Sequence, residues 1–188
     1  FIEAVANKPR SYYAFEMLYW CGMREGELLA LTREDFDFAK QTVRINKTFQ
    51  KLEGKDHIGT PKTQKSNRTI IMPDFLAEEM EMYINSLYGY RPADRIFQIS
   101  KSFLHHEMDR GAKAAGVPEI RIHDLRHSHV SLLINMGYSA LAIGERLGHE
   151  SIKVTYRYAH LFPTVQTEMA KKLGAEREEI LDVPKEER

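Results

Sequence analysis

The sequence predicts a mainly α-helical domain that carries a small antiparallel β-sheet, an α+β arrangement. Several segments repeat apolar residues at helical spacing, whereas only residues 42–46 and 68–72 alternate polar and apolar side chains as strands do. At 188 residues the chain is long enough for one hydrophobic core and short for two. We therefore expect one domain over residues 1–188.

The first half of the chain begins with helices and continues into the sheet. Residues 11–21 have a helical period, with Ser11 as the expected N-cap and Gly22 as the expected end. A short helix should follow Arg24. The segment between the two strands is rich in glycine and lysine and should be a turn region, and the next helix should begin at Asp74.

The second half reads as a series of helices. One should cover residues 102–116, and the pattern is helical again from Asp124 onward. Ser139 can cap a short helix that Gly148 ends. A last helix should cover residues 164–173.

Charge is balanced overall but unevenly distributed. The chain has 27 Lys and Arg and 27 Asp and Glu, so net charge gives no support to nucleic-acid binding. Residues 174–188 hold six acids and three bases, and we expect a flexible acidic tail there. Residues 44–68 hold seven bases and two acids, a local excess that could contact a phosphate backbone or could only keep a hairpin edge soluble. The bases are Arg44, Lys47, Lys51, Lys55, Lys62, Lys65 and Arg68.

The remaining gross features favour a cytoplasmic protein. The chain has no apolar run that could span a membrane, no signal peptide at its start, and Cys21 as its single cysteine. A reducing compartment is therefore the default. Because the first residue is Phe1 and not methionine, we expect a piece of a longer protein.

Two arginine motifs could bind a phosphodiester. Arg24 has Glu27 three residues later, on the same helix face, where the carboxylate can orient the guanidinium. His123 precedes Arg126 by three residues at the start of a helix, where backbone N–H groups add to an anion site. Two guanidinium groups can hold the equatorial oxygens of a phosphoryl transition state, although each motif alone is also typical of a surface ion pair or helix cap.

Two further residues could complete such a site. His149 follows Leu147-Gly148 at a helix end, and Tyr158 comes nine residues later. Tyr156 is a competing candidate nucleophile. It falls four residues after Ile152 on the apolar face, whereas Tyr158 should point away from that face, so we favour Tyr158.

Metal binding is a competing interpretation of the histidines. His123 and His127 are four residues apart and His129 follows, but the metalloprotease pattern is absent and no carboxylate or cysteine has ligand spacing. We therefore expect no metal and no cofactor.

The order of these residues resembles the catalytic domain of the tyrosine recombinases, the phage and transposon integrase family. The resemblance rests on the segment Gly22–Leu31, on His123-x-x-Arg126, on Leu147-Gly148-His149 and on the spacing to Tyr158. It implies the fold of that domain and a DNA recombinase that cuts and rejoins strands through a 3′-phosphotyrosine. It also implies that amino-terminal DNA-binding domains are missing from this chain.

The resemblance implies a role for each site residue. Arg24 and Arg126 would bind the phosphate, His123 and His149 would assist proton transfer, and Tyr158 would attack. Lys62, in Thr60-Pro61-Lys62-Thr63, matches the family's hairpin lysine and would be the general acid, with Lys65 as the competitor. The implied partners are double-stranded DNA and other copies of the chain in a tetramer, to which Met169 and Leu173 could contribute apolar contacts.

Two alternatives remain open on the sequence. A type IB topoisomerase uses nearly the same residues to relax DNA. A non-catalytic relative would bind DNA without forming a covalent adduct. The natural task of the protein and its target site are not encoded in any of these motifs.

Overall fold

The computed structural model describes residues 1–61, 63–149, 151, 153, 155, 158 and 170–177. The elements in chain order are α1 (Ile2–Val5), α2 (Pro9–Cys21), α3 (Glu25–Leu28), the 3-10 turn η1 (Arg33–Asp35), β1 (Phe36–Asp37), β2 (Thr42–Ile45), β3 (Thr48–Leu52), β4 (Lys55–Gly59), the 3-10 turn η2 (Gln64–Ser66), β5 (Arg68–Ile71), α4 (Asp74–Asn85), α5 (Lys101–Ala115), α6 (Ile122–Asn135) and α7 (Ala140–Leu147).

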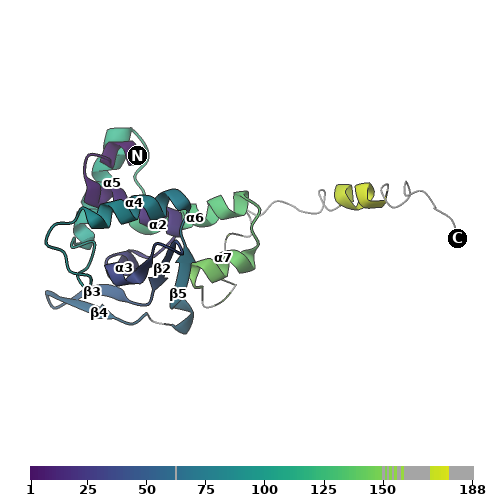
Figure 1. Ribbon diagram of the computed structural model, residues 1–188. Helices are drawn as coiled ribbons and strands as arrows, with labels where there is room; N and C mark the ends of the chain where they lie inside the picture. The colour runs from purple at the N-terminus through teal and green to yellow at the C-terminus, as the bar shows by residue number, and fades with distance from the viewer. Residues whose placement is uncertain are drawn as a thin grey trace.

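The longer helices lie above the strands, and α3 packs between α2 and β3 (Figure 1). Helix α2 contacts α1, α4 and α6, and α1 also packs on α5. The main core is filled with large side chains that are essentially fully buried, among them Phe15, Leu18, Leu76 and Phe97. The mainly helical α+β class expected from the sequence is confirmed.

The expected pairing of two antiparallel strands is also confirmed. Strand β2 pairs with β5 in the register Thr42↔Ile71 to Ile45↔Arg68, and β1 adds a third strand on the other side of β2. Val43 and Ile70 are buried opposite each other, whereas Arg44 is exposed. One face of the sheet therefore meets the core and the other faces solvent.

The region expected as a turn contains a second hairpin. Strands β3 and β4 pair antiparallel from Thr48↔Gly59 to Leu52↔Lys55, and β3 packs on α3. The sequence did not show this hairpin because both strands are mostly exposed, so their apolar residues do not alternate with a buried face.

Helix α2 begins earlier than expected. Pro9 occupies the first turn, and Ser11 lies inside the helix instead of capping it. The Ser11 hydroxyl donates to Glu107 Oε2 at 3.0 Å, and Lys8 and Arg110 pair with the same carboxylate at 2.6 and 2.8 Å. This ionic cluster around the buried Glu107 carboxylate joins the start of α2 to α5. Its hydrogen bonds lower the pKa of Glu107 to about 2 although burial acts to raise it.

Both ends of α7 are where the sequence predicted them. Ser139 Oγ accepts the Ala142 N–H at 3.2 Å, and Gly148 ends the helix with a left-handed φ of 67°. Helix α7 packs on the second half of α6 around a small separate core of Val130, Ile134, Ile143 and Leu147.

Residues 170–177 are helical and exposed. The helix expected to end at Leu173 therefore continues to residue 177, beyond the expected start of the acidic tail; the rest of both segments lies outside the described residues. In the part of the chain that the structure describes, none of the helices is long and apolar enough to cross a membrane.

Candidate active site

Arg24 is held at the junction of α2 and α3. Gly22 ends α2 with a φ of 60°, and a Cβ there would meet the His129 ring at 2.5 Å and Leu147 at 2.7 Å, so only glycine allows this approach. Arg24 then caps α3 from an extended conformation. Glu27 accepts the Arg24 backbone N–H at 2.9 Å and its Nη1–H at 2.8 Å. The carboxylate orients Arg24 as the sequence led us to expect.

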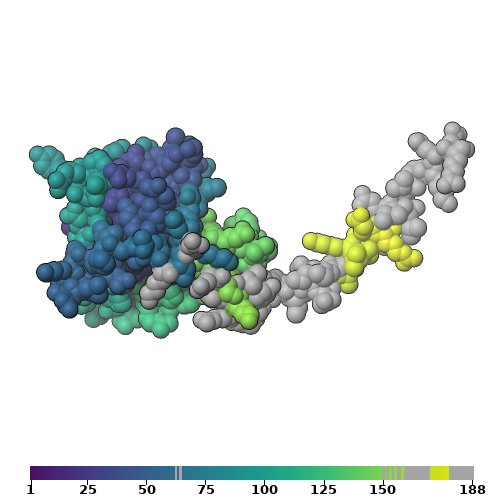
Figure 2. Space-filling model, turned by 90° about the horizontal axis from the view of Figure 1, so that it is seen from below, coloured from purple at the N-terminus to yellow at the C-terminus, as the bar shows by residue number. Residues whose placement is uncertain are grey.

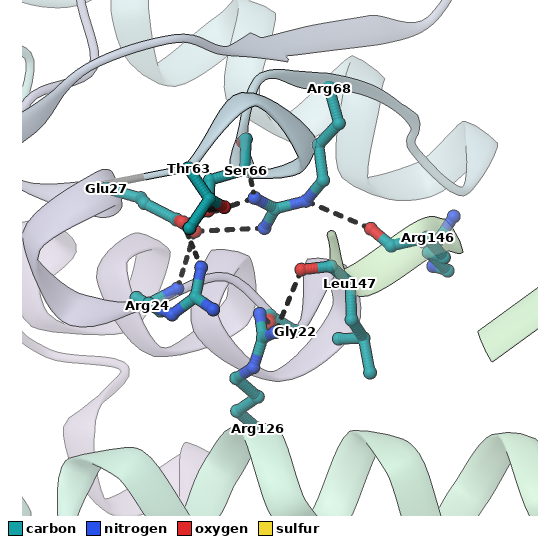
Figure 3. A network of polar contacts seen from close by, with 9 residues as sticks. All are labelled: Gly22, Arg24, Glu27, Thr63, Ser66, Arg68, Arg126, Arg146 and Leu147. Carbon is teal, nitrogen blue, oxygen red and sulfur yellow. Dashed lines mark hydrogen bonds and ion pairs between the residues drawn. The ribbon is translucent and has the colours of Figure 1, made fainter. Parts of the chain in front are cut away.

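Glu27 also binds Arg68 of β5. The Nη2 and Nη1 groups of Arg68 donate to the two carboxylate oxygens at 2.9 and 3.2 Å, which makes the pair bidentate (Figure 3). Burial acts to raise the pKa of Glu27, but the hydrogen bonds and charge of Arg68, with those of Arg24, lower it. Glu27 is therefore ionised at neutral pH.

Two residues of the basic stretch, Arg68 and Lys47, have carboxylate partners within the protein. The Arg68 side chain is only 6% exposed because its guanidinium turns inward to Glu27. The Lys47 ammonium pairs with Asp35 at 2.8 Å and donates to Thr32 Oγ1 at 2.8 Å. Both charges are directed to protein groups in this structure, and whether they also contact DNA stays a prediction.

Arg126 reaches from α6 to the ends of two other helices (Figure 3). Its Nη1 donates to the Gly22 carbonyl at 2.6 Å and its Nη2 to the Leu147 carbonyl at 2.8 Å. These carbonyls lie at the carboxyl ends of α2 and α7, where the helix dipoles favour a cation. Burial, followed by the charges of Arg24 and Arg68, lowers the pKa of Arg126 to about 9, which leaves it charged at neutral pH.

Tyr158 lies against α6 at this site. Its hydroxyl hydrogen-bonds His127 Nδ1, and its ring packs on the small core around Val130. The negative form of Tyr158 acts on Arg126 to raise its pKa, so the phenol lies within electrostatic reach of that guanidinium. Ile152 and Tyr156, which define the helix face from which Tyr158 was expected to point away, lie outside the described residues, so that expectation stays a prediction.

His123 stands in the first turn of α6, next to His127. The two rings meet edge to face with their centroids 4.8 Å apart. Desolvation of the ring, followed by the charges of His127 and Arg126, lowers the pKa of His123. A neutral imidazole at neutral pH follows, and such a ring can accept a proton.

His149 lies where the end of α7 meets residues 65–68, at the start of β5. Its Nδ1 hydrogen-bonds Thr155 Oγ1 at 2.9 Å. Gly148 makes the approach possible, since a Cβ there would lie 2.6 Å from the Lys65 carbonyl oxygen and 2.9 Å from Arg68 Cδ. His149 and Lys65 line the same hollow of about 610 Å³ between β5 and α7.

The expected general acid, Lys62, lies outside the described residues. Its neighbours are described. The Thr63 and Ser66 hydroxyls are 3.0 Å apart, and the Ser66 carbonyl accepts Arg68 Nη1 at 3.1 Å. The segment after Lys62 is therefore tied to the Glu27 cluster.

The remaining basic residues stay on the surface. Arg44 on β2, Lys51 on β3, Lys55 on β4 and Lys65 are exposed. Seen from below, the strands (blue) and the residues around α7 (green) share one face (Figure 2). Of these four cations, Lys65 lines the hollow at His149.

Two residues of the site, His127 and Arg146, were not predicted as such from the sequence. His127 was considered only as a possible metal ligand, although its position directly after Arg126 placed it beside the site. Arg146 donates to Trp20 O, Ile71 O and His129 Nε2. These acceptors lie on α2, β5 and α6, and no local sequence motif connects those elements. Among the described residues, histidine, cysteine and carboxylate side chains form no cluster of three that could hold a metal.

Known proteins resemble this chain in sequence and in fold. Residues 1–164 match the model of the phage integrase family. The ICEBs1 integrase of Bacillus subtilis (strain 168) is 35% identical over 191 aligned residues, which cover 92% of this chain and 52% of the relative. The tyrosine recombinase XerC of Bifidobacterium longum (strain DJO10A) is 29% identical, with 85% of this chain and 45% of the relative covered.

Solved structures share the fold. The Tn1549 transposon integrase in complex with circular intermediate DNA has a TM-score of 0.75 at 23% identity, covering 85% of this chain and 59% of that chain. The catalytic domain of bacteriophage HP1 integrase has a TM-score of 0.57 at 22% identity, covering 85% and 80%. The chain spans about half the length of the curated relatives named here.

Proposed function

Because this chain belongs to the phage integrase family, we propose that it is the catalytic part of a tyrosine site-specific recombinase. It would cut and rejoin double-stranded DNA through a 3′-phosphotyrosine. The observation that carries the proposal is the convergence of Arg24, Arg126 and Tyr158 from three distant segments. Glu27 bonds both Arg24 and Arg68 of β5 and so links the first of these segments to the sheet.

The two arginines suit a phosphodiester. The Arg24 side chain is 41% exposed, so it can reach a ligand, while Glu27 fixes its direction. Arg126 uses two of its donors on helix-end carbonyls and is held beside Arg24. Positively charged forks fixed before the substrate arrives stabilise the negative charge that the phosphoryl group develops in the transition state.

The proposed reaction exchanges one phosphoester for another. The oxygen of Tyr158 attacks the scissile phosphorus, the bond from phosphorus to the 5′ oxygen breaks, and the DNA 3′ end becomes linked to the tyrosine. The phenol loses a proton, and the leaving 5′ oxygen gains one, which we assign to Lys62. Because the phosphoester bond energy is kept, rejoining to a new 5′ hydroxyl needs no ATP.

The phenol must be deprotonated as it reacts. With an ordinary pKa near 10, only about one tyrosine in a thousand is ionised at neutral pH. His127 hydrogen-bonds the hydroxyl and His123 lies beside His127, so this pair can receive the proton. Cations at the site also favour the phenolate.

DNA would lie across the face that carries the exposed strand cations. Arg44, Lys51, Lys55 and Lys65 would contact phosphates there, and their exposure supports this. The chain would act as a tetramer on two DNA sites, and the 70% exposure of Leu173 is consistent with an apolar contact to a neighbouring copy.

A covalent-adduct assay tests the proposal. Duplexes that the protein itself selects from a random library are given a nick near the cut site, so that the cleaved strand diffuses away and the adduct accumulates. A protein–DNA band on a denaturing gel is expected for the wild type and not for Tyr158→Phe, with equal DNA binding by both. Binding without an adduct in the wild type would favour a non-catalytic relative, and plasmid relaxation without recombinants would favour a topoisomerase.

A further inference from the structure

Arg68 joins more parts of the site than any single motif suggested. It lies at the start of β5, and its guanidinium makes four hydrogen bonds to protein groups. Two go to the Glu27 carboxylate, one to the Ser66 carbonyl and one, from Nε at 3.0 Å, to the Arg146 carbonyl. A guanidinium has five N–H donors, so little capacity is left for a phosphate.

We propose, resting on the recombinase function above, that Arg68 is a positioning residue that acts through Glu27 and the end of α7 to place Arg24 and Arg126. It would not contact DNA. Its effect on the reaction would come from holding the two phosphate-binding arginines at a fixed separation.

The link to Arg24 runs through one carboxylate. Glu27 Oε1 accepts from Arg24 Nη1 at 2.8 Å and from Arg68 Nη1 at 3.2 Å. Oε2 accepts from the Arg24 backbone N–H and from Arg68 Nη2, both at 2.9 Å. With both oxygens held from the Arg68 side, the carboxylate cannot rotate, and Arg24 keeps its direction.

The link to Arg126 runs through adjacent carbonyls at the end of α7. Arg68 Nε bonds the carbonyl of Arg146, and Arg126 Nη2 bonds that of Leu147 at 2.8 Å. Loss of Arg68 would therefore release the helix end that Arg126 also uses. The charge of Arg68 reaches Arg126 as well, where it contributes to the lowered pKa.

Exposure separates Arg24 from Arg68, and the number of bonded donors separates Arg126 from Arg68. Arg126 is itself buried, but two of its five N–H donors are bonded to residues that the structure describes, against four in Arg68. The Arg24 side chain is 41% exposed and faces the open side of the site, whereas that of Arg68 is 6% exposed behind Glu27. Lysine could keep the charge of Arg68 but not its planar fork, so Arg68→Lys should be a partial replacement.

The test compares cleavage with DNA binding. Arg68→Met and Arg68→Lys are measured with Arg91→Met as control, because the Arg91 side chain is 84% exposed and pairs with Asp94 at the surface. We expect the single-turnover rate of adduct formation at saturating DNA to fall about 100-fold in Arg68→Met, the size of effect that a misplacement of about 1 Å can produce. The fall should be smaller in Arg68→Lys and absent in the control.

DNA affinity and its salt dependence should be unchanged in Arg68→Met. If Arg68 contacted a phosphate, the slope of log affinity against log salt would fall by about 0.9 and affinity would drop with it. That result, or an unchanged cleavage rate, would overturn the positioning role.

A double-mutant cycle with Glu27→Gln tests the route of the effect. If Arg68 acts through Glu27, the rate loss in the double variant is clearly smaller than the two single losses combined, and fully additive losses would overturn the inference. Thermal melting is recorded for every variant, and a rate loss matched by loss of folded protein, including in Arg68→Lys, would show a merely structural role. Failure of the wild type to form an adduct would instead overturn the proposed function itself.

Discussion

Replacement of Gly148 by alanine should disturb the site more than the fold. Gly148 has a φ of 67°, and an added Cβ would lie 2.6 Å from the Lys65 carbonyl oxygen and 2.9 Å from Arg68 Cδ. The first of these atoms is backbone and cannot rotate away. The end of α7 and residues 65–68 must therefore separate by roughly half an ångström or more to relieve the overlap.

Two costs add in this variant. A left-handed conformation costs a residue with a Cβ about 1–2 kcal/mol, and the overlap adds about 1–3 kcal/mol. The shift also falls on the bonds from Arg68 to Arg146 O and from Arg126 to Leu147 O. We expect cleavage at saturating DNA to fall by about 10- to 100-fold, since misplacement by about 1 Å can cost the larger of these factors.

Gly116→Ala is the matched control. Gly116 also ends a helix with a left-handed φ, of 65°, but nothing lies within 4 Å of its added Cβ. It should lose only about 1–2 kcal/mol, seen as a fall in melting temperature of about 2–4 °C per kcal/mol, with cleavage unchanged. Equal melting shifts and equal cleavage rates in the two variants would refute the close-approach reasoning at Gly148.

Further predictions concern metal, DNA and pH. Adduct formation should persist in EDTA, since arginines and lysine are proposed to supply the positive charge; loss in chelator with recovery on adding a divalent ion would contradict this. Reversing the charge of Lys51 and Lys55 should weaken DNA binding broadly and flatten the salt slope by about 0.9 for each phosphate that the protein no longer neutralises, and an unchanged slope would show a solvated edge. Glu107→Gln should destabilise the protein by about 3 kcal/mol near neutral pH, because a pKa lowered from 4.5 to about 2 stabilises the fold above pH 4.5 and ceases to do so as the pH falls through 2. Urea unfolding at several pH values should show the difference from wild type shrink toward pH 2, and a constant difference would contradict the assignment.

Local signals predicted much of the fold. Ser139 and Gly148 bound α7 as expected because a side-chain cap and a left-handed glycine act within a few residues of the helix end. The pairing of β2 with β5 followed from alternation with one buried face. Strands β3 and β4 are mostly exposed on both faces, so their sequences lack the alternation of polar and apolar residues that predicts a strand.

Local sequence patterns did not predict which partner a charged side chain turns toward. Lys47 and Arg68 belong to a basic stretch, yet each turns to a carboxylate, Asp35 or Glu27, that precedes it by 12 or 41 residues. A count of charges along the chain contains no information on such a partner. The contact between Tyr158 and His127 likewise depends on how α7 folds back on α6.

The most direct test of the account identifies the tyrosine that becomes joined to DNA. The adduct formed on a nicked duplex is digested with protease and nuclease, and the nucleotide-linked peptide is sequenced by mass spectrometry. We predict that the modification lies on Tyr158 and that Tyr156→Phe leaves its yield unchanged. A nucleotide on Tyr156, or an adduct that persists in Tyr158→Phe, would contradict the assignment of the nucleophile.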